Sequence, residues 1–576
     1  MKRIIGIITI LLIIIGAGYM YLRFHVLKAK DFKPVEAKAK NVVDLRPAII
    51  AKLQQLVKNG SNGLYTLNID RIEPDVLNSK LTIYNASLNV DSNSMRVLDQ
   101  QKKLPDDIFR IKLNDLHIDG LGIDIFLHKD SINVTGIHID KPIINVYHHN
   151  RVYNKTEREK NAKLPLYARI LGTMRSISIG KIDVRNGTFI LHNKEKYKDD
   201  TRLNEVGIQL GKVLIDSATQ YDYNRFLFAK TASFSAKNYF LPTPDSLYVF
   251  SIGSIAVSAD QHTLTAQNIK LKAKGGKQQF EKKLKFRKEM YDVSVPKLTM
   301  KGVNWWSIVN RDKWFSNQMD LFNPTMYVYL DPRIPASPSI TPNNFPHQML
   351  MKLPIPISVA KLNLHDLTVT YEELNQKIDK TGIVHFDRIN GQITDISNIP
   401  AQIKKHPIAI ADAKGYFMNT SAASARMIFY LNKQATGNFA VDIKVDTLNN
   451  YTINPVAEPL ALFSIKKGQF ENGTAHVEGN NNGSKASVAI VYRDLHITPL
   501  KADSNNNGKL KRKSILSFFA NKLLIKDNNP GSNGQLRKPE YTVERDHHGN
   551  FFNFVWLSIM TGVLKTIGIP VKFVIK

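Results

Sequence analysis

The chain has no cysteine among its 576 residues. This absence excludes structural disulfides, thiolate nucleophiles, iron–sulfur clusters and zinc sites with cysteine ligands. The sequence also lacks the phosphate loop GxxxxGK[ST], the nucleophile elbow GxSxG and the zinc helix HExxH. We therefore predict no catalytic residue, no metal site, no cofactor and no enzymatic activity. An enzyme whose site follows none of these motifs stays open as an alternative.

Clusters of residues that could bind a ligand are few. The adjacent histidines His148-His149 and His547-His548 are poor chelators, because neighbouring residues of a strand point to opposite faces. Aromatic residues gather at Trp305, Trp306 and Trp314. A stacking site for sugars or bases is conceivable there, but large aromatic side chains usually bury, so we favour a core-packed turn.

Acidic residues are scarce relative to basic ones, with 50 Asp and Glu against 79 Lys and Arg, for a net charge of +29. The simplest interpretation of this net charge is a lysine-rich surface. A more specific interpretation is attraction to anionic lipid headgroups. Basic residues form scattered short clusters, such as 282–288 and 509–513, without a nucleic-acid-binding motif. We therefore expect no nucleic-acid partner.

Long apolar runs are limited to the N-terminus, where Ile4–Leu22 contains no charged side chain. Its 19 residues are close to the roughly 20 that an α-helix needs to cross a bilayer. We predict an uncleaved membrane anchor over residues 1–30. Its apolar and interfacial positions include Ile4, Leu11, Ile15, Tyr19 and Leu22. The alternative is a signal peptide cleaved after Gly16-Ala17-Gly18.

The orientation of the anchor is less direct. Basic residues follow the apolar run at Arg23, Lys28 and Lys30, and local charge alone would place this side in the cytoplasm. That rule is weak for large translocated domains. We therefore expect the bulk of the chain outside the cytoplasm. Residues 31–60 read as an amphipathic connecting helix, because apolar residues recur at helical spacing and Asn59-Gly60 supplies a stop.

Alternation of period two dominates residues 61–505, which we predict to be one elongated β-domain with a possible subdivision at the proline-rich segment 332–356. A phrase of two apolar pairs separated by two residues recurs at uneven spacing, which excludes a propeller or a fixed-length solenoid. Its copies begin at Ile111, Ile132, Ile177, Phe250, Val293 and Leu362. Both pairs can share one face only if the strand has a bulge, bend or turn at the gap. Asn186-Gly187 and Asn472-Gly473 are hairpin signals.

Two helices are predicted in the C-terminal region 506–576, at Ser514–Ile525 and Phe551–Ile567. The second is apolar on most sides and too short to span a bilayer comfortably. We favour a helix that plugs or caps the core, with a membrane-surface or partner-docking helix and a second span as alternatives. Its principal apolar residues are Phe551, Phe554, Trp556, Leu557, Met560 and Leu564.

Three segments, ISIGKIDVRNGTFIL, SILSFFANKLLIKDNNP and YTVERDHHGNFFNFVWLSIMTGVLKTIG, together with the N-terminal anchor, resemble the AsmA-like family of Gram-negative envelopes. The resemblance implies a mainly β fold: a transmembrane helix, then a long, curved antiparallel sheet shaped like a taco, a repeating β-groove. It implies a single-pass inner-membrane protein with its bulk in the periplasm. Its function would be to conduct phospholipids between the inner and outer membranes and support outer-membrane biogenesis. The family offers no catalytic residues to transfer.

An apolar trough also follows from the residues themselves. A one-sided antiparallel sheet must bury its apolar face, and few helices are available here to cover it. We expect phospholipid acyl chains as partners, beside the inner membrane and an outer-membrane or envelope protein. The candidate lining residues are Ile177, Ile179, Ile182, Val184, Ile252, Val257, Leu364 and Leu367. The alternative function is a non-enzymatic scaffold or assembly factor for outer-membrane proteins that acts through exposed strand edges.

Overall fold

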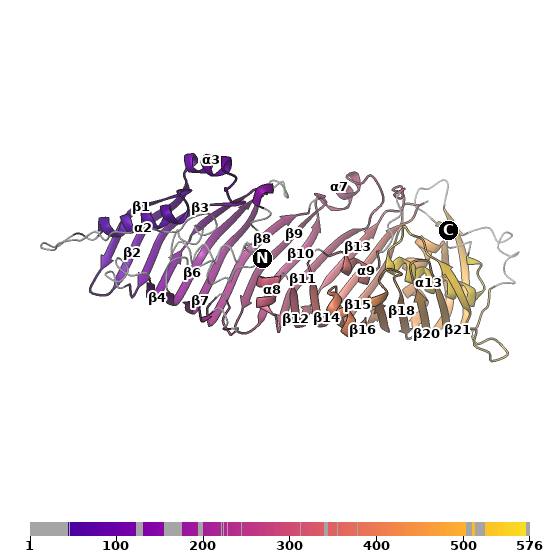
Figure 1. Cartoon of the computed structure of the whole chain (residues 1–576). Coiled ribbons are helices and arrows are strands. Elements are labelled where there is room, and N and C mark those ends of the chain that lie inside the picture. Colours follow the sequence, from indigo (N-terminus) through magenta and orange to yellow (C-terminus); the bar gives the residue numbers. More distant parts are fainter. Residues whose placement is uncertain are drawn as a thin grey trace. The chain divides into compact units, whose positions relative to one another are not determined.

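The computed structural model describes residues 44, 46–121, 131–154, 176–193, 200–219, 222, 224–226, 228–243, 245–311, 313–338, 344–353, 355–376, 378–502, 510–512 and 525–571. These residues are mainly β-strand (Figure 1). They divide into two compact units. Unit 1 comprises 1–244, 251–266 and 308–311, and unit 2 comprises 245–250, 267–307 and 312–576. The proline-rich segment 332–356 therefore lies within unit 2.

The first described element of unit 1 is α2 (Arg46–Gly60), which packs on the first strand. The side chain of Asp44 accepts a hydrogen bond from the Arg46 backbone N–H at 3.1 Å. The remaining elements are β1 (Tyr65–Asp75), β2 (Lys80–Val90), α3 (Ser92–Gln100), β3 (Asp107–Asp119), β4 (Ser131–Asp140), β5 (Ile143–His148), β6 (Ser176–His192), β7 (Thr201–Ile215) and β8 (Thr231–Pro242). A small core between α2, α3 and the strands contains Val57, Leu64, Leu98 and Ile108.

The sheet of unit 1 is mixed, so the prediction of a wholly antiparallel sheet was wrong. β1, β2 and β3 pair antiparallel, and β3 pairs antiparallel with both β4 and β5. The short strands β4 and β5 then pair in parallel with β6, and β7 and β8 return to antiparallel pairing. β4 and β5 lie end to end along β3. Because β5 and β6 pair in parallel, a long connection must join the end of β5 to the start of β6.

Unit 2 contains β11 (Met290–Lys301), β12 (Trp314–Phe322), β13 (Thr325–Leu330), α9 (Pro346–Met351), β14 (Ile357–Leu374), β15 (Thr381–Ser397), α10 (Pro400–Lys405), β16 (Ile408–Phe417), β17 (Ser421–Tyr430), β18 (Phe439–Val445), β19 (Leu448–Asn449), α11 (Asn450–Val456), a π-helical turn (Ala457–Ala461), β20 (Phe463–Gly479), β21 (Gly483–Ala502), β22 (Leu510–Arg512), β23 (Glu540–Glu544) and α13 (Phe551–Ile567). It also contains α7 (Gly276–Lys282). The residues of β9 (Tyr248–Ser258), β10 (Thr263–Ala273) and α8 (Trp305–Arg311) are divided between the two units.

Unit 2 repeats the strand arrangement of unit 1. β11 pairs antiparallel with both β12 and β13, which pair in parallel with β14, and β14 pairs antiparallel with β15. From there β16, β17, β18, β20, β21 and β23 continue in antiparallel order. The β3–β7 and β11–β15 blocks are therefore two copies of one arrangement, about 180 residues apart.

The sequence carries this duplication in two places. ISIGKIDV (177–184) of β6 corresponds to ISVAKLNL (357–364) of β14. Lys141-Pro142, between β4 and β5, corresponds to Asn323-Pro324, between β12 and β13. The repeated phrase noted in the sequence was a sign of this larger unit, but its uneven spacing concealed the common offset.

The gaps inside the apolar phrases are bends, as the alternation requires. In β14 the register with β15 shifts between Leu364 and Leu367, where Asp366 has φ 55°. In β6 the register with β7 does not shift at the gap Gly180-Lys181, but Lys212 of β7, opposite Gly180, has φ 51°. The register of β6 shifts after the phrase, between Val184 and Gly187, beside Asn186 with φ 54°. Asn186-Gly187 is therefore a bulge inside a continuous strand, and the hairpin prediction was wrong. Asn472-Gly473 likewise lies inside β20, next to a register shift. A left-handed asparagine suits a bulge as well as a hairpin turn.

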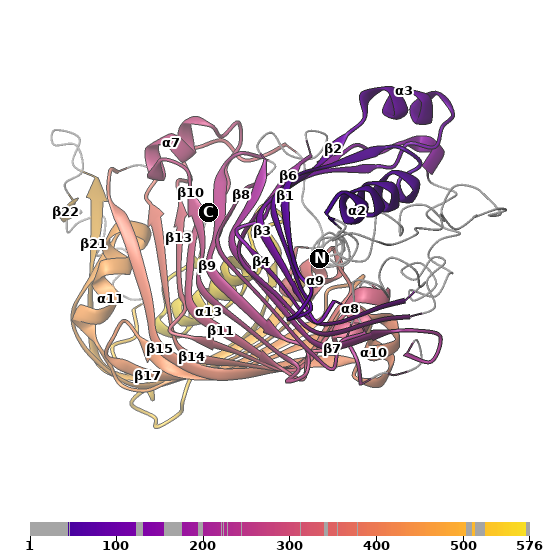
Figure 2. The ribbon, with the colours of Figure 1, turned by 90° about the vertical axis from the view of Figure 1, so that its left-hand side faces the viewer.

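The C-terminal helix α13 belongs to the core of unit 2. Figure 2 shows the strands of this unit curving around it. Its side chains Phe551, Phe554 and Val555 join a buried cluster with Phe439, Val441 and Val488 of the sheet. Asn550 caps the helix by accepting a hydrogen bond from the Asn553 N–H at 2.8 Å, and Gly568 ends it with φ 85°.

Several predicted segments lie outside the described residues. They are the anchor 1–30 with Ile4, Leu11, Ile15, Tyr19 and Leu22, and the helix Ser514–Ile525 except for its last residue. No helix within the described ranges is both long enough and apolar enough to cross a bilayer.

Candidate functional site: an apolar sheet face in unit 2

Strand β14 has one apolar and one polar face. Register with β15 places Ile357, Val359, Leu362, Leu364, Leu367 and Val369 on one face. The opposite face carries Ser358, Asn363, His365 and Thr368. Two bends keep the apolar residues together: Asp366 at φ 55°, and Asp395 of β15 at φ 58°, which lies opposite Ala360. Without these bends the apolar side chains would divide between the two faces.

Neighbouring strands continue the same face. Met319 and Leu321 of β12 are in register with Leu362 and Leu364, and Met326 of β13 with Val369. On the other side, Ile393 of β15 is in register with Leu362 and Ile389 with Leu367. Side chains directly opposite one another on paired strands share a face. These apolar side chains are only half-buried, whereas Val359 on the same face of β14 is buried.

Farther along, the face is built from very small residues. Ala411 and Ala413 of β16 lie in register with Ile393 and Gly391. Ala423 and Ala425 of β17 lie opposite Gly415 and Ala413. Short side chains leave room above the backbone, whereas the polar face of the same strands carries longer groups, such as the ion pair of Arg426 with Asp412 at 2.9 Å. We call these alanines, together with the half-buried apolar residues of β12–β15 named above, the apolar floor.

Helix α13 bounds the floor on the side of β17–β23. It presses its small residues against the sheet: Ser558 shares a hydrogen bond with Ser484 at 2.8 Å. A Cβ at Gly562 would lie 2.2 Å from the Tyr541 hydroxyl oxygen and 2.5 Å from Val488. Three other large residues of the helix are less covered: Phe552 is 58% exposed, and Trp556 and Met560 are half-buried.

The predicted residues of α13 divide between these two environments. Phe551, Phe554 and Leu564 are buried, and Trp556, Leu557 and Met560 are half-buried. The helix therefore has apolar residues on two sides. The side with Phe551, Phe554 and Leu564 is buried in unit 2, and the other side is only partly covered.

The predicted groove residues also divide. Ile177, Ile179, Ile182 and Val184 of β6 are at most 4% exposed. They form a closed core in unit 1. Ile252, Val257, Leu364 and Leu367 are half-buried and keep part of their surface accessible. Periodicity gave the face of each strand but could not show how much of that face another part of the chain covers.

Polar residues mark one end of the apolar face. On β14 it ends in Tyr371 and Glu373, whose side chains form a hydrogen bond of 2.6 Å from the tyrosine hydroxyl to the carboxylate. Burial raises the pKa of Glu373, and nearby Glu289 adds to the effect, while Tyr371 and Arg287 oppose it. Glu289 in turn accepts a hydrogen bond from Asn550 at the start of α13, at 2.8 Å. This end of the face therefore carries polar groups beside the apolar residues.

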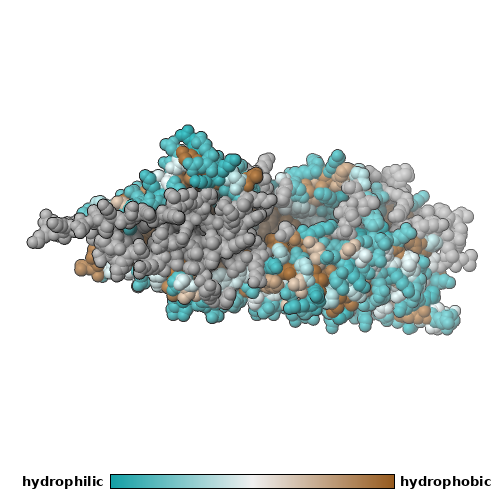
Figure 3. Space-filling view, in the orientation of Figure 1, coloured by the Kyte–Doolittle hydropathy of each residue, from teal (hydrophilic) through white to brown (hydrophobic). Residues whose placement is uncertain are grey.

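Apolar residues are interspersed with polar ones across the described part of the surface seen in Figure 3. Within the described residues, no group of three or more histidine, aspartate or glutamate side chains could hold a metal ion. The chemistry available on the floor is therefore burial of apolar groups, which is non-directional and scales with the area removed from water.

Comparison with known proteins adds little. No protein-family model matches the chain, and no curated protein does. Among solved structures, the crystal structure of the sex pheromone staph-cAM373 precursor aligns with 62% of this chain and 96% of its own, at 10% identity. The TM-score of that alignment is 0.12, so the similarity carries no argument about fold or function.

Proposed function

We propose that this protein is a membrane-anchored, AsmA-like lipid carrier. It binds phospholipid acyl chains on the apolar floor of unit 2 and conducts them between the inner and outer membranes of a Gram-negative envelope. In this proposal Ile4–Leu22 anchors the chain in the inner membrane, and the bulk of the chain lies in the periplasm. The observation that carries the proposal is the half-buried apolar face of β12–β16.

The energetics of such a face favour acyl chains. Each methylene group removed from water contributes about 0.8 kcal/mol. A chain that lays eight methylenes on the floor would gain roughly 6 kcal/mol before the cost of immobilisation. A ligand without a long apolar part would gain nothing comparable from Leu362, Leu364 or Leu367. The floor therefore favours lipid tails over small polar metabolites.

Photocrosslinking tests this function. The purified full chain is exposed to a phospholipid with a photoactivatable acyl chain. Leu367→Asp should abolish labelling, because a charged side chain on the floor must be desolvated whenever a tail binds. Thr368→Asp, on the opposite face of β14, is the matched control and should keep labelling. Equal labelling of the two variants would overturn the proposal.

A second variant guards against misfolding of Leu367→Asp. Ala413→Phe fills the shallow part of the floor without introducing charge, and Lys414→Phe adds the same ring on the opposite face. We expect reduced labelling only for Ala413→Phe, at unchanged thermal stability. If wild-type protein instead captured an envelope protein stoichiometrically and no lipid, a scaffold function would replace the lipid carrier.

The location has its own test. An alkaline phosphatase domain fused after residue 576 should be active in Gram-negative cells, because that enzyme matures only outside the cytoplasm. An N-terminus beginning after Gly18 on the mature protein would contradict the uncleaved anchor.

A further inference from the structure

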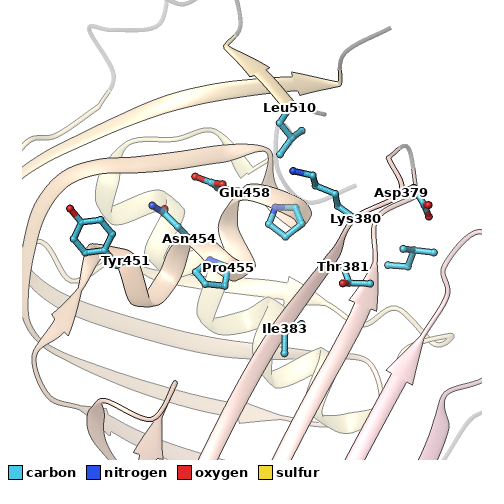
Figure 4. Close-up of a pocket in the computed structure, with 11 residues that line it drawn as sticks. Asp379, Lys380, Thr381, Ile383, Tyr451, Asn454, Pro455, Glu458 and Leu510 are labelled. Atoms are coloured by element: carbon cyan, nitrogen blue, oxygen red, sulfur yellow. The ribbon is translucent and has the colours of Figure 1, made fainter. Parts of the chain in front are cut away.

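A cavity of about 740 Å³ lies in unit 2, where the hairpin between β14 and β15 meets α11 and the π-helical turn (Figure 4). Its size falls in the range of small-molecule sites, roughly 300–1,000 Å³. The lining residues are Leu374, Asp379, Lys380, Thr381, Ile383, Tyr451, Asn454, Pro455, Glu458, Pro459 and Leu510. None of them belongs to the apolar floor defined above.

The wall of the cavity is fixed by hydrogen bonds. The side chain of Asn454 accepts one from the Ile465 N–H at 2.8 Å and donates one to the Ile465 carbonyl at 3.0 Å. The Asn375 side chain donates to the Pro459 carbonyl at 2.6 Å. A Cβ at Gly382 would lie 2.4 Å from the Leu460 side chain, so the strand and the turn are in close contact. The cavity is therefore formed before any ligand binds.

The π-helical turn gives the cavity its charge. Such turns are rare and are frequent at functional sites, because the extra residue redirects side chains. Here the turn Ala457–Ala461 carries Glu458 into the cavity. One carboxylate oxygen of Glu458 accepts a hydrogen bond from the Ser464 hydroxyl at 2.6 Å. In the described part of the chain, its other oxygen has no hydrogen-bond partner.

A lysine faces the same space. Figure 4 shows the side chain of Lys380 reaching beneath Leu510, and Glu458 lines the same cavity. Among the described residues neither side chain forms an ion pair, with the other or with a third group. Asp379 points away from them in the same view and lies 3.6 Å from Arg333. One cavity thus presents a separated ammonium and carboxylate to a ligand.

Apolar groups complete the lining. Leu374 is buried, and Ile383, Pro455, Pro459 and Leu510 add further apolar surface. A purely anionic ligand would be repelled by the carboxylate of Glu458, and a purely cationic ligand would be repelled by the ammonium of Lys380. A ligand with both charges and an apolar continuation satisfies all three features.

We propose that this cavity binds the headgroup of a zwitterionic phospholipid, with its phosphate on Lys380 and its ammonium on Glu458. This proposal rests on the lipid-binding function proposed above and assigns it a headgroup class. Lysine is a common phosphate ligand as a point charge, and a carboxylate pairs with an alkylammonium. The apolar lining receives the glycerol and the first methylenes of the tails.

Headgroup selectivity tests the proposal. Phosphatidylethanolamine and phosphatidylglycerol with the same photoactivatable acyl chains are offered separately to the detergent-solubilised full chain. Wild-type protein should label preferentially with phosphatidylethanolamine. Glu458→Gln keeps a hydrogen-bond acceptor for Ser464. It should lower the ratio of phosphatidylethanolamine to phosphatidylglycerol labelling by about fivefold, as expected for the loss of one partly exposed ion pair. Lys380→Gln should reduce labelling by both lipids.

Glu478→Gln is the matched control, because it removes the same kind of charge from β20, outside the residues that line the cavity. It should leave the preference unchanged, and thermal unfolding should show that all three variants fold. Labelling that is lost in Leu367→Asp but shows no headgroup preference in wild type would overturn the cavity proposal and leave the lipid function standing.

No labelling of wild type by either lipid would instead overturn the lipid function. A titration with free O-phosphoethanolamine, monitored by ligand-observed NMR, then tests the cavity by itself. Saturable binding that both Lys380→Gln and Glu458→Gln weaken supports the same chemistry for a free phosphate ester. Absence of binding overturns the cavity proposal.

Discussion

Lys141 and Asn323 occupy equivalent positions in the two copies of the strand arrangement. Both have left-handed backbone angles, φ 48° and 49°, and both precede a proline. Lys141 donates its backbone N–H to the Arg185 carbonyl and Asn323 donates to the His365 carbonyl, each at 2.8 Å. The carbonyls of Pro142 and Pro324 then accept from Thr188 and Thr368. In each unit the left-handed residue and the proline after it separate two short strands. These two strands, β4 and β5 or β12 and β13, run along a single long strand, β6 or β14.

This break predicts a conformational cost for branched residues. Asn323→Val should lower the free energy of unfolding by about 1–2 kcal/mol, because a left-handed conformation is costly for a β-branched residue. Thr325→Val, two residues later on β13, should change it by less than about 0.5 kcal/mol. Denaturant unfolding of both variants measures the difference. Equal stabilities would show that the left-handed angle at Asn323 carries no strain.

The close contact between α13 and the sheet gives a second prediction. Gly562→Val should lower the free energy of unfolding by about 1–3 kcal/mol, since its Cβ has no room beside Tyr541 and Val488. Met560→Leu, on the half-buried side of the same helix, should cost less than about 1.5 kcal/mol. Thermal unfolding compares them, and a stability of Gly562→Val equal to that of wild type would contradict the observed packing.

Removal of the whole helix should have a larger effect. Deletion of residues 551–576 withdraws Phe551, Phe554 and Leu564 from buried clusters. Truncation of a single buried phenylalanine typically costs about 3–5 kcal/mol, so the loss of the helix should destabilise unit 2 or cause aggregation. Size-exclusion chromatography and calorimetry measure both. If the truncated chain stays monomeric at unchanged stability, α13 does not cap the sheet.

A buried histidine predicts sensitivity to acid. His347 is 3% exposed, and among the described residues neither ring nitrogen has a hydrogen-bond partner. Burial lowers its pKa from 6.5 to about 4, so the folded state holds the neutral ring. As the pH falls from 7 to 4.5, the unfolded state takes up the proton first. This linkage should lower the free energy of unfolding by roughly 2–3 kcal/mol.

The variant His347→Leu isolates this contribution. It should retain the core with Phe345 and Phe429 and should lose less stability between pH 7 and pH 4.5 than wild type. Urea unfolding at the two pH values gives the comparison. An identical pH dependence of both proteins would assign the acid sensitivity to other groups.

Local patterns predicted much of the secondary structure. Alternation placed β3, β6, β11 and β14, and the bounds of α13 agree with the predicted helix at 551–567. The requirement that both apolar pairs of a phrase share a face predicted bends at the gaps, and left-handed residues such as Asp366 and Asp395 provide them. These features depend on residues close in sequence, and local chemistry is enough to set them.

Pairing between distant strands was not predictable in the same way. The parallel pairing of β4 with β6 and of β12 with β14 depends on long connections and on where each strand is broken. Lys141-Pro142 and Asn323-Pro324 were the available signals, together with the match of ISIGKIDV to ISVAKLNL. The cavity at Lys380 and Glu458 joins segments almost 80 residues apart and had no signal of its own.

The sequence by itself determined the class of the fold, the apolar face of each strand and the short apolar helix near the C-terminus, because alternation and helical spacing are read from neighbouring residues. Only the tertiary structure decided which apolar faces are closed. The same phrase is buried at Ile179 and Ile182 and half-buried at Leu364 and Leu367. Burial depends on what packs over a residue from elsewhere in the chain, and periodicity along one strand carries no information about that.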